Sequence, residues 1–166
     1  MLAAIALGSN LSSRFGAPAD NLHEALRRLA SLGRVTAVSS FHETEPVGYA
    51  DQPRFLNAAA LLETKRSPLD LLHGLLTIEQ AMGRDRTSAP PKGPRMIDLD
   101  LLLYQESEDP ETPTGSIVLN DPELTLPHPA LHERRFVLAP LAEIAPQMQH
   151  PVYRKTIRRL LTELAS

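Results

Sequence analysis

The segment GPRMIDLDLLLY, at residues 93–104, places two aspartates inside a run of apolar residues. A short apolar run bounded by polar loops is typical of a buried strand. Because side chains alternate along a strand, Asp98 and Asp100 are expected on one face, roughly 6–7 Å apart. The opposite face is expected to carry Ile97, Leu99, Leu101 and Leu103. Carboxylates in an apolar setting are costly unless cations neutralise them, so the segment predicts a positive partner.

Basic side chains gather just before this strand, although the chain as a whole has a net charge of −3. They are Arg84, Arg86, Lys92 and Arg95. A polyphosphate needs several such cations around it, and Mg²⁺ is commonly shared between carboxylates and phosphates. The combination predicts a site for a nucleoside triphosphate that lacks the GxxxxGK[ST] motif of a P-loop. The alternative is that the aspartates only form salt bridges with the arginines.

A second candidate cluster lies in TEPVGYADQPRFLN, at residues 44–57. Thr44 and Asn57 offer hydrogen bonds, and Phe55 offers a ring for stacking. Together such groups can select a flat, polar heterocycle. The alternative is that Asn57 caps the loop and that Phe55 belongs to the core.

A third cluster lies in LPHPALHERRF, at residues 126–136. His128 stands between two prolines and is therefore held rigidly. It either binds a phosphate or a metal-bound water, or it is a simple turn residue. Of Arg134 and Arg135, one is expected to reach the phosphates and the other to be solvated or ion-paired. Glu79 lies late in a predicted helix, and nothing local distinguishes it from a surface residue.

The order of the predicted elements indicates the fold class. Apolar periodicity and turn residues predict strands at 3–8, 34–41, 55–64 and 93–104, a loop at 42–54, and helices at 20–33 and 69–82. Gly33 is predicted to cap the first helix, and Ser67 with Pro68 to begin the second. The order β-α-β-β-α-β is the ferredoxin-like pattern of an α+β fold (an α/β sandwich), in which helices pack on an antiparallel sheet.

The remaining third of the chain has fewer regular patterns. We expect an exposed loop at 105–116, a short edge strand at 116–119, a helix after the Pro127–Pro129 turn, and a terminal helix at 154–166. A length of 166 residues is enough for one well-packed domain, which we expect to span 1–166.

Composition excludes several classes of function. The net charge of −3 argues against a general nucleic-acid binder. No apolar run is as long as a membrane span, and the first residues show no signal peptide, so a cytoplasmic protein is expected. The chain has no cysteine, which excludes disulfides and thiolate metal sites and fits a reducing compartment.

Several motifs occur together in an order and spacing that resemble a known family. They are LGSNL, SSFHETEPVG, DQPRFLNAA, GRDR, GPRMIDLDLLLY and LPHPALHERRFVLAPLAEIAP. The chain resembles the 6-hydroxymethyl-7,8-dihydropterin pyrophosphokinases of folate biosynthesis over nearly its whole length, and the pairing of GPRxxDLD with LPHP…RxF is highly specific. The resemblance implies transfer of the β,γ-diphosphate of ATP to the pterin hydroxymethyl group, with release of AMP.

The resemblance also implies roles for the matched positions. Asp98 and Asp100 would bind two Mg²⁺ ions, and with Arg84 and Arg95 they would form the catalytic set. The pterin pocket would consist of Thr44, Val47, Phe55, Asn57 and Phe136. ATP would contact Glu79, Arg84, Arg86, Lys92, Arg95, Leu101, Thr125, His128 and Arg134.

The sequence departs from the family pattern at two places. Pro91-Lys92 stands where the family often has a basic-aromatic pair that closes over the pterin, so Lys92 supplies charge but no ring. Glu123 stands where some relatives carry an arginine near the phosphates. The polar segment from Arg84 to Lys92 is expected to form a mobile lid, because two substrates must enter.

Two other functions are compatible with these residues. One is a Mg²⁺-dependent phospho- or nucleotidyltransferase that acts on another alcohol, and product analysis for AMP separates it from diphosphate transfer. The other is a non-catalytic ferredoxin-like module that binds a nucleotide or metabolite for regulation. The favoured reading is a monomeric enzyme whose small-molecule substrates are ATP and the pterin and which binds neither nucleic acid nor a membrane.

Overall fold

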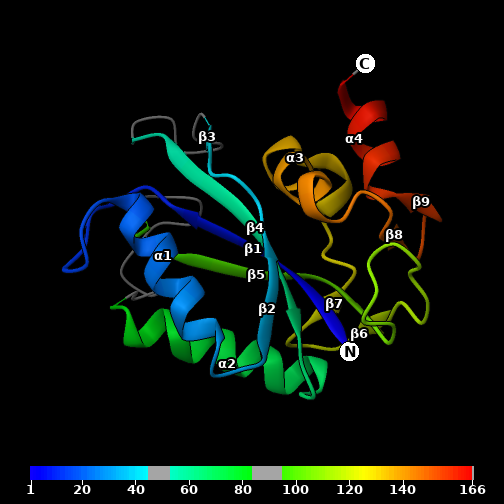
Figure 1. Cartoon of the computed structure of the whole chain (residues 1–166), viewed down its shortest axis with the longest axis horizontal. Helices are drawn as coiled ribbons and strands as arrows, with labels where there is room; N and C mark the ends of the chain where they lie inside the picture. Colours follow the sequence, from blue (N-terminus) through cyan, green and yellow to red (C-terminus); the bar gives the residue numbers. More distant parts are fainter. Residues whose placement is uncertain (45–52, 84–94, 166) are drawn as a thin grey trace.

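The computed structural model describes residues 1–44, 53–83 and 95–165 of the chain. Its centre is an antiparallel sheet in the strand order β2-β4-β1-β5, shown in Figure 1. These strands are β1 (Leu2–Ser9), β2 (Arg34–Val38), β4 (Phe55–Glu63) and β5 (Asp98–Gln105), and the short β3 (His42–Thr44) pairs with the start of β4. β1 therefore lies inside the sheet, and β5 forms one of its edges.

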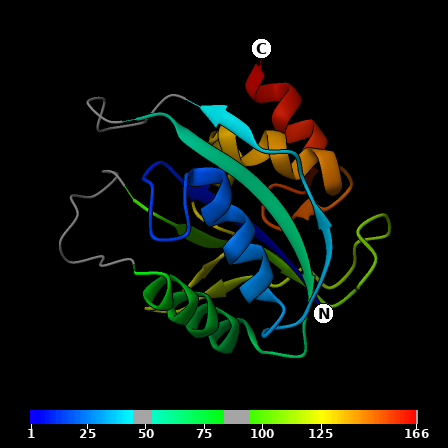
Figure 2. The same ribbon diagram turned by 60° about the vertical axis from the view of Figure 1, so that its left-hand side comes forward.

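Helices cover both faces of the sheet, as Figures 1 and 2 show. On one face lie α1 (Pro18–Leu29) and α2 (Pro68–Ala81), and on the other lie α3 (Arg135–Ile144) and α4 (Ile157–Ala165). Two apolar clusters fill these layers, one around Leu22 and Leu71 and the other around Leu138 and Leu141. The order β1-α1-β2-β4-α2-β5 confirms the predicted ferredoxin-like α+β fold.

β5 does not keep one alternation along its whole length. Its register against β1 shifts once, just beyond Leu101. Ile97, Leu99 and Leu101 belong to the cluster under α1 and α2, whereas Leu103 belongs to the cluster under α3. The expectation that Leu103 shares a face with Leu99 is therefore wrong, because a β-bulge adds one residue and reverses the alternation after it.

The first helix ends earlier than predicted. α1 runs from Pro18 to Leu29 rather than over 20–33, so Gly33 is not its cap. A Cβ atom at Gly33 would lie 2.1 Å from the backbone oxygen of Glu63. Glycine is needed there because the chain passes against the end of β4.

The second helix begins as predicted. The Ser67 hydroxyl accepts a hydrogen bond from the Asp70 amide at 3.3 Å, and Pro68 is the first helical residue. The helix ends just before Gly83, whose φ of 101° is a left-handed conformation suited to glycine.

The chain after Val38 is not one continuous strand. β3 occupies His42–Thr44, where a loop was predicted. Between the two strands, the Ser39 amide donates to the Ala59 carbonyl and the Ser39 hydroxyl accepts from the Ala59 amide, both at 2.9 Å. The Ser39 hydroxyl thus replaces a backbone carbonyl as the partner of the Ala59 amide at this break. The chain then pairs with β4 again as β3.

The C-terminal third contains two short hairpins. β6 (Leu119–Asn120) pairs with β7 (Thr125–Leu126), and β8 (Gln149–His150) pairs with β9 (Lys155–Thr156). The predicted edge strand at 116–119 is therefore a strand only from Leu119. The helix expected after the prolines is delayed by a 3₁₀ turn, η1 (Leu131–Glu133), before α3 begins.

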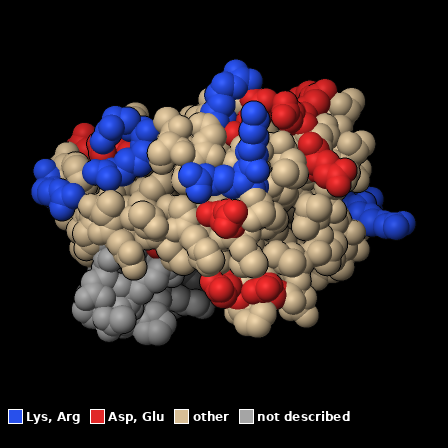
Figure 3. Space-filling model, turned by 90° about the horizontal axis from the view of Figure 1, so that it is seen from below, with Lys and Arg blue, Asp and Glu red and all other residues tan. Residues whose placement is uncertain are grey.

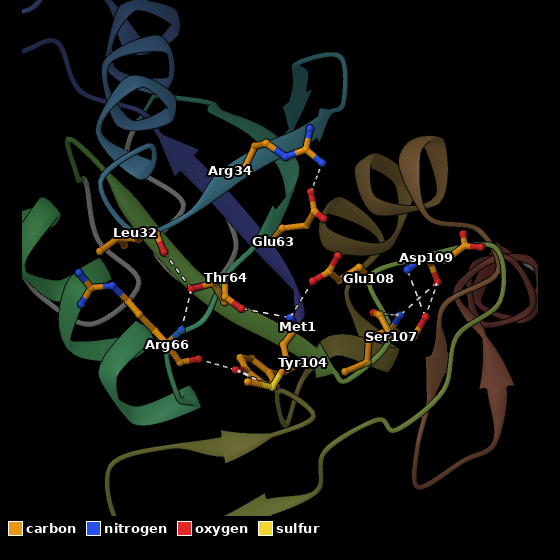
Figure 4. Close-up of polar contacts among 11 residues, drawn as sticks. Met1, Leu32, Arg34, Glu63, Thr64, Arg66, Tyr104, Ser107, Glu108 and Asp109 are labelled. Carbon is orange, nitrogen blue, oxygen red and sulfur yellow. Dashed lines mark hydrogen bonds and ion pairs between the residues drawn. The ribbon is translucent and has the colours of Figure 1, made fainter.

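Polar contacts close the end of the sheet where β4 stops, as Figure 4 shows. The Thr64 hydroxyl donates to the Leu32 carbonyl at 2.8 Å, and the Thr64 carbonyl accepts from the Met1 amino group at 3.1 Å. The Tyr104 hydroxyl donates to the Arg66 carbonyl. These contacts fix the positions of the loops at this end of the sheet.

The charged surface is mixed on the face seen in Figure 3, where Lys and Arg side chains are interspersed with Asp and Glu. In the described ranges, no helix combines the length and the apolar character that crossing a membrane requires.

Gly33→Ala tests the packing of the chain against β4. We expect the free energy of unfolding to fall by about 1–3 kcal/mol, because the new Cβ meets backbone that can move only with the strand. Gly74→Ala is the matched control, since its Cβ meets only the side chain of Leu32 and gains helix propensity. Urea unfolding measures both, and equal stabilities of Gly33→Ala and the wild type would contradict this account.

Candidate active site

A cavity of about 260 Å³ opens at the end of the sheet where β1 stops and β5 starts. Strands β1, β3, β4 and β5 and the start of α3 all contribute to its lining, which consists of Ala6, Leu7, Gly8, Thr44, Phe55, Asn57, Arg95, Asp98, Asp100, His128, Arg134, Phe136 and Val137. Members of all three sequence clusters thus meet in one place.

The paired aspartates occupy the β5 side of this cavity. Asp98 lies opposite Gly8 of β1 and Asp100 opposite Ala6, so both carboxylates stand beside very small side chains. Arg95 Nη1 donates to Asp98 Oδ2 at 3.1 Å, and both side chains are about four-fifths buried. The salt bridge expected under the purely structural alternative exists for Asp98, but both carboxylates also line the cavity.

Aromatic rings and an amide line another part of the same cavity. Asn57 is 8% exposed, and its Nδ2 donates to Thr44 Oγ1 at 2.6 Å. Any side chain at Gly8 would begin only 3.1 Å from Asn57 Oδ1, so glycine makes room for the amide. Phe55 belongs to neither apolar core cluster of the described chain and lines the cavity with Phe136, so the alternative that placed it in the core is wrong.

Two arginines lie near these rings. The Arg95 guanidinium carbon is 5.5 Å from the centre of the Phe55 ring, and that of Arg134 is 5.7 Å from the Phe136 ring. Cations at such distances from aromatic faces are attracted to them. The rings therefore also hold the guanidinium groups at the cavity.

His128 presents a neutral ring whose tautomer is determined by its neighbours. Its Nδ1 accepts a hydrogen bond from the Ala130 amide at 3.1 Å, so the proton of the neutral ring is on Nε2. Burial lowers the pKa of His128, and the charge of Arg134 acts in the same direction. His128 therefore lies in the cavity as a neutral hydrogen-bond donor.

A second cavity, of about 460 Å³, adjoins the first and shares Asp100 and His128 with it. It lies between α2, β5 and the segment around β7. Its lining is mostly apolar and comprises Leu72, Leu76, Leu99, Asp100, Leu101, Glu123, Leu124, Thr125, His128 and Pro129. Leu101 and Thr125, which are predicted ATP contacts, are thus brought together with His128.

Glu79 is not a surface residue. It is 1% exposed, and its Oε2 accepts a hydrogen bond from the Leu99 amide at 2.7 Å. Backbone groups point in the same direction at every second residue of a strand, so the N–H and C=O groups of Leu101 also face the outer edge of β5. Leu101 lines the second cavity at this edge. The predicted contact of Glu79 with ATP stays a prediction, since neither cavity includes this side chain.

Sequence reasoning missed Asn10, which positions segments that lead to the cavity. Its Oδ1 accepts from the Arg95 amide at 2.8 Å, and its Nδ2 donates to the Pro53 carbonyl at 3.0 Å. The Asn10 amide also donates to the Arg95 carbonyl at 3.0 Å. The buried Asn10 side chain thus connects the segment before β4 to the segment before β5. The sequence signals were the turn GSN, which is also common in ordinary loops, and its place in the LGSNL motif, to which no role was assigned.

Four predicted site residues cannot be placed. Val47, Arg84, Arg86 and Lys92 lie outside the described residues, as does the rest of the predicted lid.

A carboxylate on α3 fastens this helix to the chain that leads into β3. Glu143 accepts from the Ser40 amide and the Ser40 hydroxyl at 2.9 Å, and its Oε2 is hydrogen-bonded to His42 Nε2. The Ser40 amide, helped by His42 and the Ser40 hydroxyl, holds the pKa of Glu143 below its ordinary value. We call these contacts of Glu143 with Ser40 and His42 the clasp. It joins α3, which carries Phe136, to β3, which carries Thr44.

The clasp predicts a pH-dependent contribution to stability. Because the pKa of Glu143 is lower in the folded than in the unfolded chain, its contribution is complete above about pH 4.5 and is lost as the pH falls through the folded-state value. Glu143→Gln should cost roughly 1 kcal/mol at pH 7, and this cost should shrink as the pH falls through the folded-state pKa of Glu143.

Thermal unfolding of both proteins across this pH range measures the difference. Glu111→Gln is the control, since its carboxylate makes no side-chain contact within the described chain. A difference that stays constant with pH would refute the role of the Glu143 charge.

Comparisons with known proteins identify the family of the chain. The family model for 7,8-dihydro-6-hydroxymethylpterin-pyrophosphokinase (HPPK) matches residues 4–146. The 2-amino-4-hydroxy-6-hydroxymethyldihydropteridine pyrophosphokinase of Haemophilus influenzae is 41% identical over 149 residues, which cover 89% of this chain and 83% of that protein.

Some similar proteins are longer. The folic acid synthesis protein fol1 of Schizosaccharomyces pombe is 39% identical over 99% of this chain, but the chain spans only about a fifth (21%) of its length. A Plasmodium falciparum HPPK-DHPS structure shares the fold with a TM-score of 0.69 at 18% identity, over 98% of this chain and 44% of that one. By its matched segment and its bacterial relative, this chain belongs to the 7,8-dihydro-6-hydroxymethylpterin-pyrophosphokinase family.

Proposed function

We propose that the protein transfers the diphosphate of ATP to 6-hydroxymethyl-7,8-dihydropterin, giving the pterin diphosphate and AMP in folate biosynthesis. The observation that carries this proposal is the pair of adjoining cavities that share Asp100 and His128. Two substrates bound side by side would meet at the carboxylates. The name of the Haemophilus influenzae relative describes the same reaction.

The first cavity suits a pterin. A pterin is flat, apolar on its faces and rich in hydrogen-bonding groups at its edge. Phe55 and Phe136 supply rings for the faces, and Thr44 and Asn57 supply polar atoms for the edge. Val47 would complete this pocket. We therefore place the hydroxymethyl group of the pterin toward Asp98 and Asp100.

The second cavity suits the adenosine part of ATP. Leucine side chains from α2 and β5 offer apolar walls for the base, and the backbone of Leu101 offers polar atoms at the outer edge of β5. The triphosphate would then extend toward His128, Arg134 and Arg95 in the first cavity. Arg84, Arg86 and Lys92 would add positive charge from the predicted lid.

The paired aspartates would bind Mg²⁺ together with a nucleotide. In the described ranges, no three carboxylate, histidine or cysteine side chains gather to bind a metal ion. Mg²⁺ requires about six oxygen ligands, and it commonly takes the remainder from substrate phosphates and water. Asp98 and Asp100 would therefore hold two Mg²⁺ ions jointly with ATP. When bound, the ions would neutralise the charge of the phosphates and lower the pKa of the attacking hydroxyl.

The reaction is a displacement at the β-phosphorus. The hydroxymethyl oxygen forms a bond to the β-phosphorus, the bond from that phosphorus to the α-phosphate oxygen breaks, and AMP leaves. Asp98 would accept the hydroxyl proton. Arg95 and Arg134 would stabilise the charge that develops on the transferred group, and His128 would donate a hydrogen bond from Nε2.

Both cavities are formed within one chain, which is consistent with a monomeric enzyme. The absence of cysteine suits a reducing compartment, and we propose the cytoplasm as its location.

Asp98→Ala tests the central role of the aspartates. AMP formation from ATP, Mg²⁺ and the pterin should fall at least about a hundredfold, because a ligand and the proton acceptor are both lost. Asp70→Ala is the matched control, since its side chain is exposed at the start of α2. If Asp98→Ala is folded by circular dichroism and still forms AMP at a near-normal rate, Asp98 has no part in the chemistry.

Metal titration tests the shared ligand set. Mg²⁺ should raise the affinity for the α,β-methylene analogue of ATP at least about tenfold, while binding weakly to the protein alone. The analogue cannot react, because the bond that would break is replaced. The double variant Asp98→Ala, Asp100→Ala should lose this increase in calorimetry. Tight Mg²⁺ binding without nucleotide would show that the protein holds the metal by itself.

A further inference from the structure

The turn between β6 and β7 holds a carboxylate in a fixed position at the second cavity. Asp121 and Leu124 exchange backbone hydrogen bonds of 3.0 and 3.2 Å, which define a tight turn. The Asp121 side chain accepts from the Glu123 amide at 3.0 Å. Glu123 lines the cavity from this turn. One of these hydrogen bonds holds the Glu123 amide itself, and the other two close the turn that carries Glu123.

A histidine on α2 holds the other end of this side chain. His73 Nε2 lies 2.7 Å from Glu123 Oε2, and the two side chains are 53% and 57% exposed. His73 follows Leu72, which lines the cavity wall. The pair thus spans from α2 to the β6–β7 turn at the solvent side of the cavity. Oε2 is engaged by His73, and within the described chain Oε1 remains as an acceptor.

Different parts of the second cavity suit different parts of a bound nucleotide. Apolar walls at Leu72, Leu76 and Leu101 suit the base, and Asp100 and His128 mark the side where the phosphates continue into the first cavity. The sugar joins these two parts, so it belongs at the partly exposed rim between them.

A carboxylate at this rim can only accept hydrogen bonds. It repels phosphate oxygens, since charges of the same sign at short range are unfavourable. A ribose presents two neighbouring hydroxyl donors on its outer edge, and a carboxylate matches such donors well.

We propose that Glu123, positioned by His73, binds the ribose hydroxyls and makes this site selective for ribonucleotides over 2′-deoxyribonucleotides. This inference rests on the proposed function, because it takes ATP as the occupant of the second cavity. An acceptor oriented toward a hydroxyl favours the ligand that carries this group, because the analogue without it forms one hydrogen bond fewer.

Equilibrium binding of ATP and 2′-deoxy-ATP, with Mg²⁺ and without pterin, tests the proposal by calorimetry. The wild type should bind ATP about tenfold more tightly than 2′-deoxy-ATP. Glu123→Ala should reduce this ratio to nearly one by weakening ATP alone. His73→Ala should reduce it part of the way, because the carboxylate remains but loses its orientation. Glu111→Ala, on the exposed loop after β5, is the control and should keep the ratio.

Several outcomes would overturn the proposal. They are an equal affinity of the wild type for both nucleotides, an unchanged ratio in Glu123→Ala, and no binding of either nucleotide. A third ligand, inosine triphosphate, distinguishes the sugar from the base. If Glu123→Ala alters the preference for ATP over inosine triphosphate but not the 2′-hydroxyl ratio, Glu123 reads the base and the proposal is wrong.

The proposed reaction can fail independently of this inference. A wild-type protein that selects ATP over 2′-deoxy-ATP but forms no AMP with the pterin would refute diphosphate transfer and retain the role of Glu123. AMP formation together with equal nucleotide affinities would refute the role of Glu123 alone.

Discussion

The pairing of β1 with β5 is the constraint on which the site depends. This register pairs Asp98 with Gly8 and Asp100 with Ala6. The two carboxylates therefore stay accessible, because these neighbouring residues are too small to cover them. On its other side β1 pairs with β4, which brings Asn57 against Gly8. A shift by one residue would turn both aspartates into the apolar layer under α1 and α2, where their charge would be unpaired.

Interactions between distant segments hold this arrangement in place. Asn10 joins the entries to β4 and β5, Glu79 binds the outer edge of β5 from α2, and Glu143 fastens α3 to the chain before β3. Each is a polar side chain whose hydrogen-bond partners lie on another element. Such side chains connect the segments that carry the site and restrict their movement relative to one another.

Local patterns in the sequence predicted the sheet, both main helices and the shared face of the aspartates, because these follow from alternation and capping within one segment. The bulge after Leu101 was not predictable, since it depends on how β5 fits β1. Burial of Glu79 and the bridging by Asn10 also depend on partners about 20 and 85 residues away in sequence. The roles in binding pterin and ATP came from the family resemblance. Residue patterns alone did not decide whether these side chains bind a ligand or only support the fold.

The central position of β1 has a consequence for how the protein is made. Both partners of this strand come later in the chain, at Phe55–Glu63 and Asp98–Gln105. During synthesis from the N-terminus, an apolar strand with two unpaired edges must wait for about a hundred residues before its second neighbour emerges. Such long-range pairing slows folding, and the carboxylate pair reaches its final surroundings only when the sheet is complete. Chaperone dependence of the nascent chain should therefore be greatest before β5 leaves the ribosome.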